Sequence, residues 1–277
     1  MKKGIKMCTI FAKREEERLV IGRSFDWLQF GGNIYFVPPY RSYGSMTLGI
    51  CYIEQLGYDK PYEGINEKGL FGGIMALPTS AKDEEEPGSL RMAAQGLLKF
   101  ILERATTVDE ALYISNKIKL DFGVKLGVPK VQYFFADAND KVGIYEQGVY
   151  EENVALDIGE YRLLTNQSAT TDYDQRCKKY KKIKEILDKN EKLDKKRTLD
   201  VIAQAKEVEL TAWTTVYNLK DREFTLCLEQ NFDDKFKFNV DKCLGNGAHS
   251  IDFAELKLNA KVMKRKRKEG FERLDIY

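Results

Sequence analysis

Cys8, in the run MCTIFA (7–12), is the residue whose type and position first suggest chemistry, because a deprotonated thiol is a strong nucleophile. In most cysteine hydrolases a histidine takes the thiol proton, and this sequence has one histidine, His249. His249 could meet Cys8 in the folded chain, although its context GNGAHS (245–250) predicts a solvent-exposed loop. The α-amino group of Cys8 is the other candidate base, since its ordinary pKa of about 7.7–8.0 lies near the thiol's value of about 8.5. That base exists only if Cys8 is the first residue of the mature chain, through a translation start at Met7 or self-cleavage after it.

A basic and an acidic residue follow Cys8 in the run IGRSFDW (21–27). A short hairpin would bring both Arg23 and Asp26 beside Cys8, and a fixed cation next to a cysteine lowers the pKa of its thiol. Arg23 and Asp26 are three residues apart, so their side chains point to opposite faces of a regular strand. Both can reach Cys8 only if the chain bends after Arg23. An exposed ion pair of little energetic weight is the alternative interpretation.

Short apolar runs separated by turn residues predict β-strands in three groups, with a pair of helices between successive groups. The expected strands cover 8–12, 19–22, 34–37, 46–53 and 70–77, then 131–136, 142–146 and 161–165, and finally 212–217, 223–228 and 235–240. The expected helices cover 89–104, a segment that begins at Thr107 with Glu110 as its capping partner, 173–187 and 198–205. Segregated strands and helices predict an α+β layered domain, because a parallel sheet needs alternating βαβ units. Without a repeat or a linker, residues 8–277 form one expected domain, after a leader, 1–7, that is removed.

Several motifs occur in an order that is specific when they are taken together. After MCT (7–9) and G-R-x-x-D-W (22–27) come GINEKGL (64–70), YFFADANDKVGIYE (133–146), LLTNQ (163–167) and WTTVYNLKDREFTL (213–226). This set, which spans about 7–240, resembles the choloylglycine hydrolase family, including bile salt hydrolases and penicillin V acylases, with acid-ceramidase-like and isopenicillin acyltransferase-like relatives. The resemblance implies a four-layer αββα N-terminal-nucleophile hydrolase sandwich, in which two antiparallel sheets pack face to face and helices cover them. It also implies hydrolysis of the carbon–nitrogen bond of a linear amide.

The same resemblance assigns roles to individual residues. Asp26 is expected to orient the α-amino group of Cys8, and Arg23 to favour the thiolate. Asn166 matches the asparagine whose side chain donates to the oxyanion, a contribution of about 3–4 kcal/mol in the transition state. Bile salt hydrolases carry a polar residue where this sequence has Ala76, so Ala76 can serve only through its backbone N–H. Their later arginine has no counterpart here; Arg176 is a weaker candidate, which resembles the arginine after the asparagine in acid-ceramidase-like relatives.

Two alternatives to an amide hydrolase stay open. An acyltransferase of the same family would pass the acyl group to an amine in place of water. A catalytically silent binding protein would keep the fold but retain the residues before Cys8, which leaves the thiol without its base. The acyl group is expected to contact Trp27, Phe30, Tyr62 or Leu77, although each of these also suits plain core packing.

Composition limits the partners. The 45 basic and 43 acidic side chains nearly cancel, so neither nucleic acid nor a membrane is an expected partner, and the expected ligand is a small N-acyl amide. No apolar run approaches the roughly 20 residues of a membrane helix, and the leader lacks a signal-peptide core, which predicts a cytoplasmic protein. The five cysteines lack metal-like spacing and predict free thiols, with no metal or cofactor. The basic segment 251–277 is expected to be a solvated helix or tail, and the lysine-rich stretch 178–184 is likewise expected to lie on the surface. A homo-oligomer remains open.

Overall fold

The computed structural model describes residues 8–27, 31–55, 60–80, 90–121, 129–204 and 210–268. The leader 1–7 and Phe30 therefore lie outside the described residues. Two antiparallel sheets form the centre of the molecule, with strand orders β14-β1-β2-β15-β16-β17 and β13-β12-β11-β8-β7-β6-β3-β18. The first sheet consists of β1 (Thr9–Arg14), β2 (Leu19–Asp26), β14 (Tyr161–Thr165), β15 (Thr211–Asn218), β16 (Glu223–Leu228) and β17 (Phe236–Asn239). The second consists of β3 (Asn33–Val37), β6 (Ile50–Glu54), β7 (Glu63–Asn66), β8 (Phe71–Ser80), β11 (Pro129–Ala136), β12 (Lys141–Glu146), β13 (Tyr150–Ala155) and β18 (His249–Asp252).

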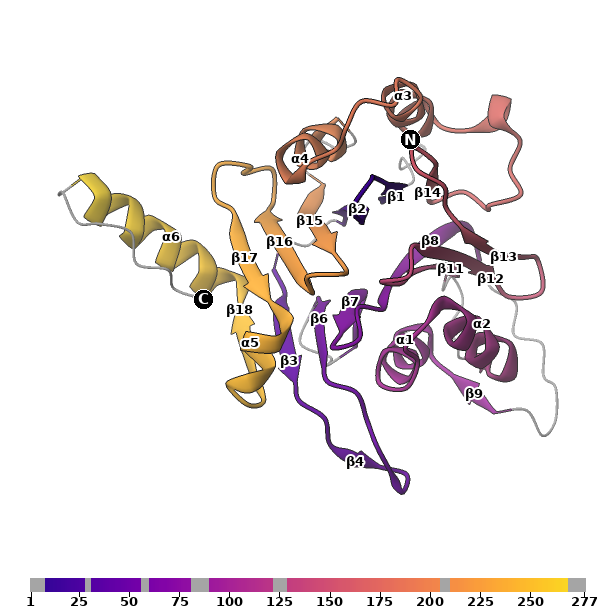
Figure 1. The fold of residues 1–277 in the computed structure, drawn as a ribbon, viewed down its shortest axis with the longest axis horizontal. Coiled ribbons are helices and arrows are strands. Elements are labelled where there is room, and N and C mark those ends of the chain that lie inside the picture. The colour runs from indigo at the N-terminus through magenta and orange to yellow at the C-terminus, as the bar shows by residue number, and fades with distance from the viewer. Residues whose placement is uncertain are drawn as a thin grey trace.

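Helices cover the outer face of each sheet, as Figure 1 shows. Helices α3 (Lys178–Leu187) and α4 (Lys195–Ala203) pack on the six-stranded sheet, and α1 (Ala94–Leu102) and α2 (Val108–Lys117) pack on the eight-stranded sheet. The layers therefore run α, β, β, α, as the resemblance of the motifs implies. The remaining elements are α5 (Val240–Gly245), α6 (Phe253–Lys268), the 3-10 turn Tyr173–Gln175 and the short strands β4 (Arg41–Ser42), β5 (Ser45–Met46), β9 (Arg91–Met92) and β10 (Lys119–Leu120).

Strand alternation explains the layers. On β1, Ile10 and Ala12 point into the core between the two sheets, whereas Phe11 packs with Ile183 and Leu187 of α3 on the outer side. A strand that is buried on both faces reads as a continuous apolar run, which is why 8–12 is recognisable in the sequence.

Three of the predicted helices differ from the structure at their start, and one of them, α4, begins at Lys195 in place of 198. The segment predicted as a helix from 89 begins with β9, which pairs with β10, and α1 starts only at Ala94. The predicted helix 173–187 is interrupted because Arg176 and Cys177 are extended. Gln167 holds this break by accepting from the Cys177 backbone N–H through Oε1 at 2.7 Å, and Cys177 Sγ caps α3. The predicted cap of α2 is confirmed, since Thr107 Oγ1 accepts from the Glu110 N–H.

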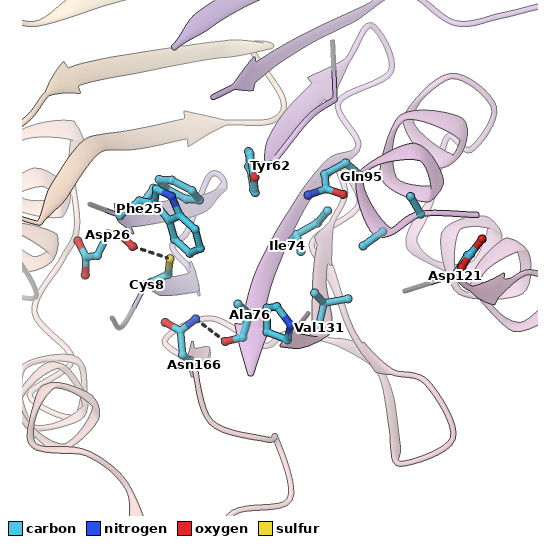
Figure 2. Close-up of a pocket in the computed structure, with 14 residues that line it drawn as sticks. Cys8, Phe25, Asp26, Tyr62, Ile74, Ala76, Gln95, Asp121, Val131 and Asn166 are labelled. Atoms are coloured by element: carbon cyan, nitrogen blue, oxygen red, sulfur yellow. Dashed lines mark hydrogen bonds between the residues drawn. The ribbon is translucent and has the colours of Figure 1, made fainter. Parts of the chain in front are cut away.

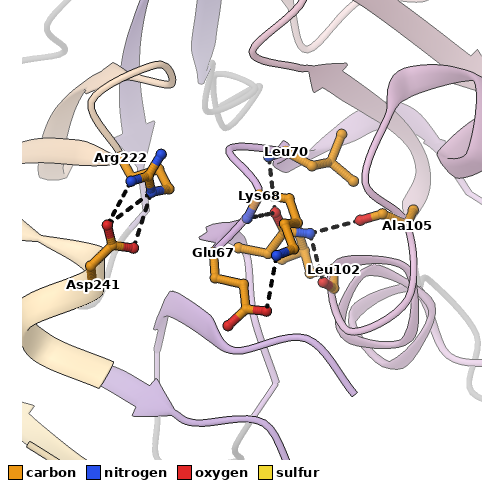
Figure 3. Close-up of polar contacts among 8 residues, drawn as sticks. Glu67, Lys68, Leu70, Leu102, Ala105, Arg222 and Asp241 are labelled. Carbon is orange, nitrogen blue, oxygen red and sulfur yellow. Dashed lines mark hydrogen bonds and ion pairs between the residues drawn. The ribbon is translucent and has the colours of Figure 1, made fainter. Parts of the chain in front are cut away.

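The GINEKGL motif forms a turn that joins β7 to β8 (Figure 3). Asn66 Oδ1 accepts from the backbone N–H groups of Lys68 and Leu70, both at 3.0 Å. Its Nδ2 donates to the carbonyls of Leu102 and Ala105, at 2.9 and 2.7 Å. Asn66 therefore fastens this turn to the C-terminal end of α1, and the motif has a structural role.

Candidate active site

Cys8 directly precedes β1 and is 5% exposed. Thr9 pairs with Ser24 of β2, so Cys8 lies beside the last residues of that strand. Its Sγ contacts the backbone carbonyl of Asp26 at 4.0 Å. The hairpin predicted to bring Cys8 next to the end of IGRSFDW is thus present.

Arg23 is fully buried between the two sheets. Its Nε pairs with Glu63 Oε2 at 2.7 Å, and its Nη1 and Nη2 donate to the carbonyls of Tyr62 and Ile74, each at 2.8 Å. Gly73 leaves the space for this guanidinium, since a Cβ there would come within 2.6 Å of Arg23 Nη1. The exposed ion pair considered for Arg23 is therefore excluded.

Glu63 is a buried partner that the sequence did not reveal. Its Oε1 accepts from three side chains of β15, Trp213 at 3.1 Å, Thr215 at 2.8 Å and Tyr217 at 3.2 Å. Glu63 thus links β7 of one sheet to β2 and β15 of the other. No local spacing signals such a pair, because Glu63 and Arg23 lie on separate hairpins.

Asp26 points to the opposite side of β2, as strand alternation predicts. Its Oδ1 accepts from Ser24 Oγ at 2.8 Å and from Thr211 Oγ1 at 2.7 Å, and its Oδ2 pairs with Lys179 Nζ at 2.6 Å. The pairing of β2 with β15 shifts register between Thr211 and Trp213, opposite Asp26 and Phe25. The extra residue at this irregularity, Ala212, lies in β15, so it is not the bend within β2 that was predicted after Arg23.

Lys179 corrects the expectation that the lysine-rich stretch 178–184 is surface. It is only 8% exposed, and it shares one face of α3 with Ile183 and Leu187, at i+4 and i+8. This spacing was the available signal, because a lysine in line with an apolar stripe must face the sheet.

Asn166 directly follows β14 and is buried. Its Nδ2 donates to the Ala76 carbonyl of β8, so the two predicted oxyanion residues lie in contact although they are far apart in sequence. Both residues border the same cavity as Cys8 (Figure 2). A carboxamide has two N–H groups, so Asn166 keeps a second donor besides the one bound to Ala76.

Neither Arg176 nor His249 borders that cavity. Arg176 Nη2 donates to the Ala169 carbonyl at 2.7 Å, and the guanidinium lies 4.8 Å from the ring centroid of Tyr180. His249 begins β18 and stacks on Phe36 at 4.6 Å, so it is not the exposed loop residue that its context predicted. Of the predicted site residues, the structure gathers Cys8, Arg23, Asp26, Ala76 and Asn166 and leaves Arg176 aside.

The family follows from comparison with known proteins. A family model described as linear amide C-N hydrolases, choloylglycine hydrolase family, matches residues 8–207. The chain belongs to this family. No match to its sequence is found among curated proteins. No helix in the described ranges is both long and apolar enough to cross a membrane.

Solved structures agree on the fold. A variant of conjugated bile acid hydrolase from Clostridium perfringens has a TM-score of 0.66 at 14% identity, over 89% of this chain and 97% of that chain. Penicillin V acylase from Agrobacterium tumefaciens has a TM-score of 0.62 at 14% identity, over 88% and 90%. The Caenorhabditis elegans ortholog of N-acylethanolamine-hydrolyzing acid amidase has a TM-score of 0.53 at 12% identity, over 77% and 93%. These similarities confirm the four-layer αββα sandwich of N-terminal-nucleophile hydrolases.

In this choloylglycine hydrolase family member, the cavity at Cys8 has a volume of about 290 Å³ and a largely apolar lining. Trp27 and Tyr62 line it, as expected of acyl contacts, whereas Leu77 does not. Figure 2 shows Cys8, Asp26 and Asn166 gathered at one end and Asp121 at the other. The lining residues are Cys8, Phe25, Asp26, Trp27, Tyr62, Ile74, Ala76, Ala93, Ala94, Gln95, Asp121, Pro129, Val131 and Asn166.

Burial dominates the electrostatics of the site. It raises the pKa of the Cys8 thiol, and the nearby Arg23 guanidinium only partly opposes that rise. Burial also raises the pKa of Asp26, against the lowering effect of Lys179. The Cys8 thiol is therefore protonated near neutral pH unless a base lies directly beside it.

Proposed function

We propose that this protein hydrolyses the amide bond of a small N-acyl compound through a thioester on Cys8, with the α-amino group of Cys8 as the base. The observation that carries the proposal is the convergence of Cys8, Asn166 and Ala76 on one apolar cavity. Because burial raises the pKa of the thiol, a base in contact with Cys8 is required. No histidine lines the cavity among the described residues, which favours the α-amino group.

Acylation begins when the α-amino nitrogen takes the thiol proton and Sγ attacks the amide carbon. The carbonyl oxygen becomes an oxyanion, and the second Nδ2–H of Asn166 and the backbone N–H of Ala76 donate to it. The resulting α-ammonium group then gives its proton to the amide nitrogen, the carbon–nitrogen bond breaks, and the free amine leaves. The acyl group remains on Cys8 as a thioester.

Deacylation repeats these proton transfers with water. The α-amino nitrogen removes a proton from a water molecule, the hydroxide attacks the thioester carbon, and the carbon–sulfur bond breaks. The thiolate recovers its proton from the α-ammonium group, and the carboxylic acid is released. Both half-reactions need a free amine on Cys8, so the peptide bond between Met7 and Cys8 must first be absent or cut.

The lining of the cavity favours an apolar acyl group, because aromatic and aliphatic side chains make up most of it. Structures with this fold include enzymes named for a conjugated bile acid, penicillin V and N-acylethanolamine. A panel of these three amide types, with N-acyl amino acids and N-acyl homoserine lactones, therefore samples the acyl groups and leaving amines to be tested.

Intact mass and turnover test the proposal together. A protein that begins at Cys8 should hydrolyse at least one member of the panel, and Cys8→Ala should abolish that turnover. Unchanged turnover in Cys8→Ala refutes the assigned nucleophile. A mass that retains residues 1–7, with no activity after deliberate trimming, favours a silent binding protein. Addition of a competing amine separates hydrolysis from acyl transfer, because an acyltransferase forms the new amide.

A further inference from the structure

Lys179 is a buried lysine on the far side of β2 from Arg23, and its partner Asp26 borders the cavity. The Nζ–Oδ2 distance is 2.6 Å, the Asp26 side chain is fully buried, and the Lys179 side chain is 6% exposed. Its neighbour Lys178, in the same turn of α3, is exposed. Burying an ion pair costs desolvation free energy that a well-packed apolar pair avoids. Folding stability alone therefore does not explain why Lys179 and Asp26 are paired here.

The charges around Cys8 come from three elements. Arg23 lies on the inner face of β2 and is paired with Glu63 of β7, while Asp26 lies at the end of β2. Lys179 approaches from α3, and its charge lowers the pKa of the Cys8 thiol, although less than Arg23 does and less than the Asp26 carboxylate raises it. The phenol of Tyr62, which precedes β7, also faces Cys8 across the cavity.

We propose that Lys179 is a positioning residue whose buried charge sets the pH range in which Cys8 works. The proposal rests on the proposed function, because it concerns the thiol and the α-amino group as a catalytic pair. In the active form the thiol and the amine share one titratable proton, which is held either by the sulfur or by the nitrogen. A cation nearby disfavours the addition of a second proton and favours the loss of the one proton. Lys179 therefore moves both limits of the active range to lower pH, toward neutrality.

The test is the pH profile of kcat/KM for Lys179→Met, which removes the charge and keeps the length of the side chain. The alkaline limb should move up by about one pH unit. The acidic limb should move less, since Asp26 without Lys179 protonates more readily and cancels part of the change in charge. Lys178→Met is the matched control, which should leave both limbs of the profile in place. Lys179→Arg, which keeps the positive charge, should have the same limbs as wild type.

Alkylation of Cys8 by iodoacetamide, followed by peptide mass spectrometry across pH, measures the thiol without turnover. The pKa of the Cys8 thiol should rise in Lys179→Met even in a chain that retains residues 1–7, so failure of the proposed function would not hide the result. Lys179→Gln, which keeps a donor for Asp26, replaces Lys179→Met if the latter does not fold. A purely structural role predicts lower activity or stability with limbs and thiol pKa shifted by less than about 0.3 unit, and that outcome overturns the proposal.

Discussion

Glu63→Gln tests whether the buried pair with Arg23 holds the two sheets together. The substitution keeps the shape of the side chain but removes its charge, in a place where both partners are fully buried. The new amide group has no good orientation. If its oxygen faces Trp213, Thr215 and Tyr217, its nitrogen faces the Arg23 Nε–H, and two donors meet; if it is flipped, its nitrogen faces the indole N–H of Trp213, which can only donate.

The expected magnitude follows from this geometry. Breaking a buried ion pair by removing one partner costs about 3–5 kcal/mol, because the other charge stays buried without compensation. The Arg23 guanidinium still donates to the carbonyls of Tyr62 and Ile74. The loss of unfolding free energy is therefore expected near the lower end of that range. Urea denaturation of wild type and Glu63→Gln measures the difference in unfolding free energy.

A matched control is available four residues along the chain. Glu67 is partly exposed, and its carboxylate lies 3.7 Å from Lys68 Nζ, so Glu67→Gln should cost no more than about 1 kcal/mol. If Glu63→Gln is destabilised by no more than Glu67→Gln, the pair is not needed to hold the two sheets, and the account given of Arg23 and Glu63 is wrong.

Three further predictions concern the cavity and the core. Asn166→Ala should lower kcat by about 10²–10³ with little change in KM, which steady-state kinetics on the substrate found in the panel would measure; a loss confined to KM would contradict an oxyanion role. Arg176→Gln should keep kcat/KM within about threefold of wild type, because its guanidinium binds Ala169 and Tyr180 outside the cavity lining, and a 100-fold loss would restore it as a candidate. Burial raises the pKa of Tyr145 to about 12, so the unfolded chain loses this phenolic proton first as pH rises. The unfolding free energy should therefore fall between about pH 10 and pH 12, and it should fall less in Tyr145→Phe, as urea titrations at pH 8 and pH 11 would show.

The strands of the two sheets could be predicted from sequence where both of their faces are buried. The two edge strands of the eight-stranded sheet were missed, because β13 alternates exposed and partly buried residues and β18 begins inside the loop-like GNGAHS. The edge strands of the six-stranded sheet, β14 and β17, were predicted. β7 was missed for a different reason: in its sequence EGIN only Ile65 is a large apolar residue, although all four residues are buried. One of its two polar residues, Glu63, is the acid that pairs with Arg23.

The residues of the site likewise divide into those that the sequence predicted and those that it did not. Cys8, Asn166 and Ala76 were predicted together through the resemblance of their motifs to a family, and the structure places them around one cavity. Glu63 and Lys179 were not predicted, because a buried charge is recognised by its partner and each partner lies on a distant element. Of these two residues, only Lys179 could have been recognised from the sequence, because Ile183 and Leu187 follow it on the same face of α3.

The three-residue spacing of Arg23 and Asp26 now has a physical explanation. Strand alternation sends the two side chains to opposite faces of β2, so a single counter-ion cannot serve both. Glu63 meets Arg23 between the sheets, and Lys179 meets Asp26 beneath α3. Cys8 lies beside the end of β2. The Arg23–Glu63 pair lies between the two sheets, and the Asp26–Lys179 pair lies on the other face of β2, toward α3. If both pairs tune the thiol, Glu63→Gln and Lys179→Met should shift its pKa in opposite directions, since one removes an anion and the other a cation.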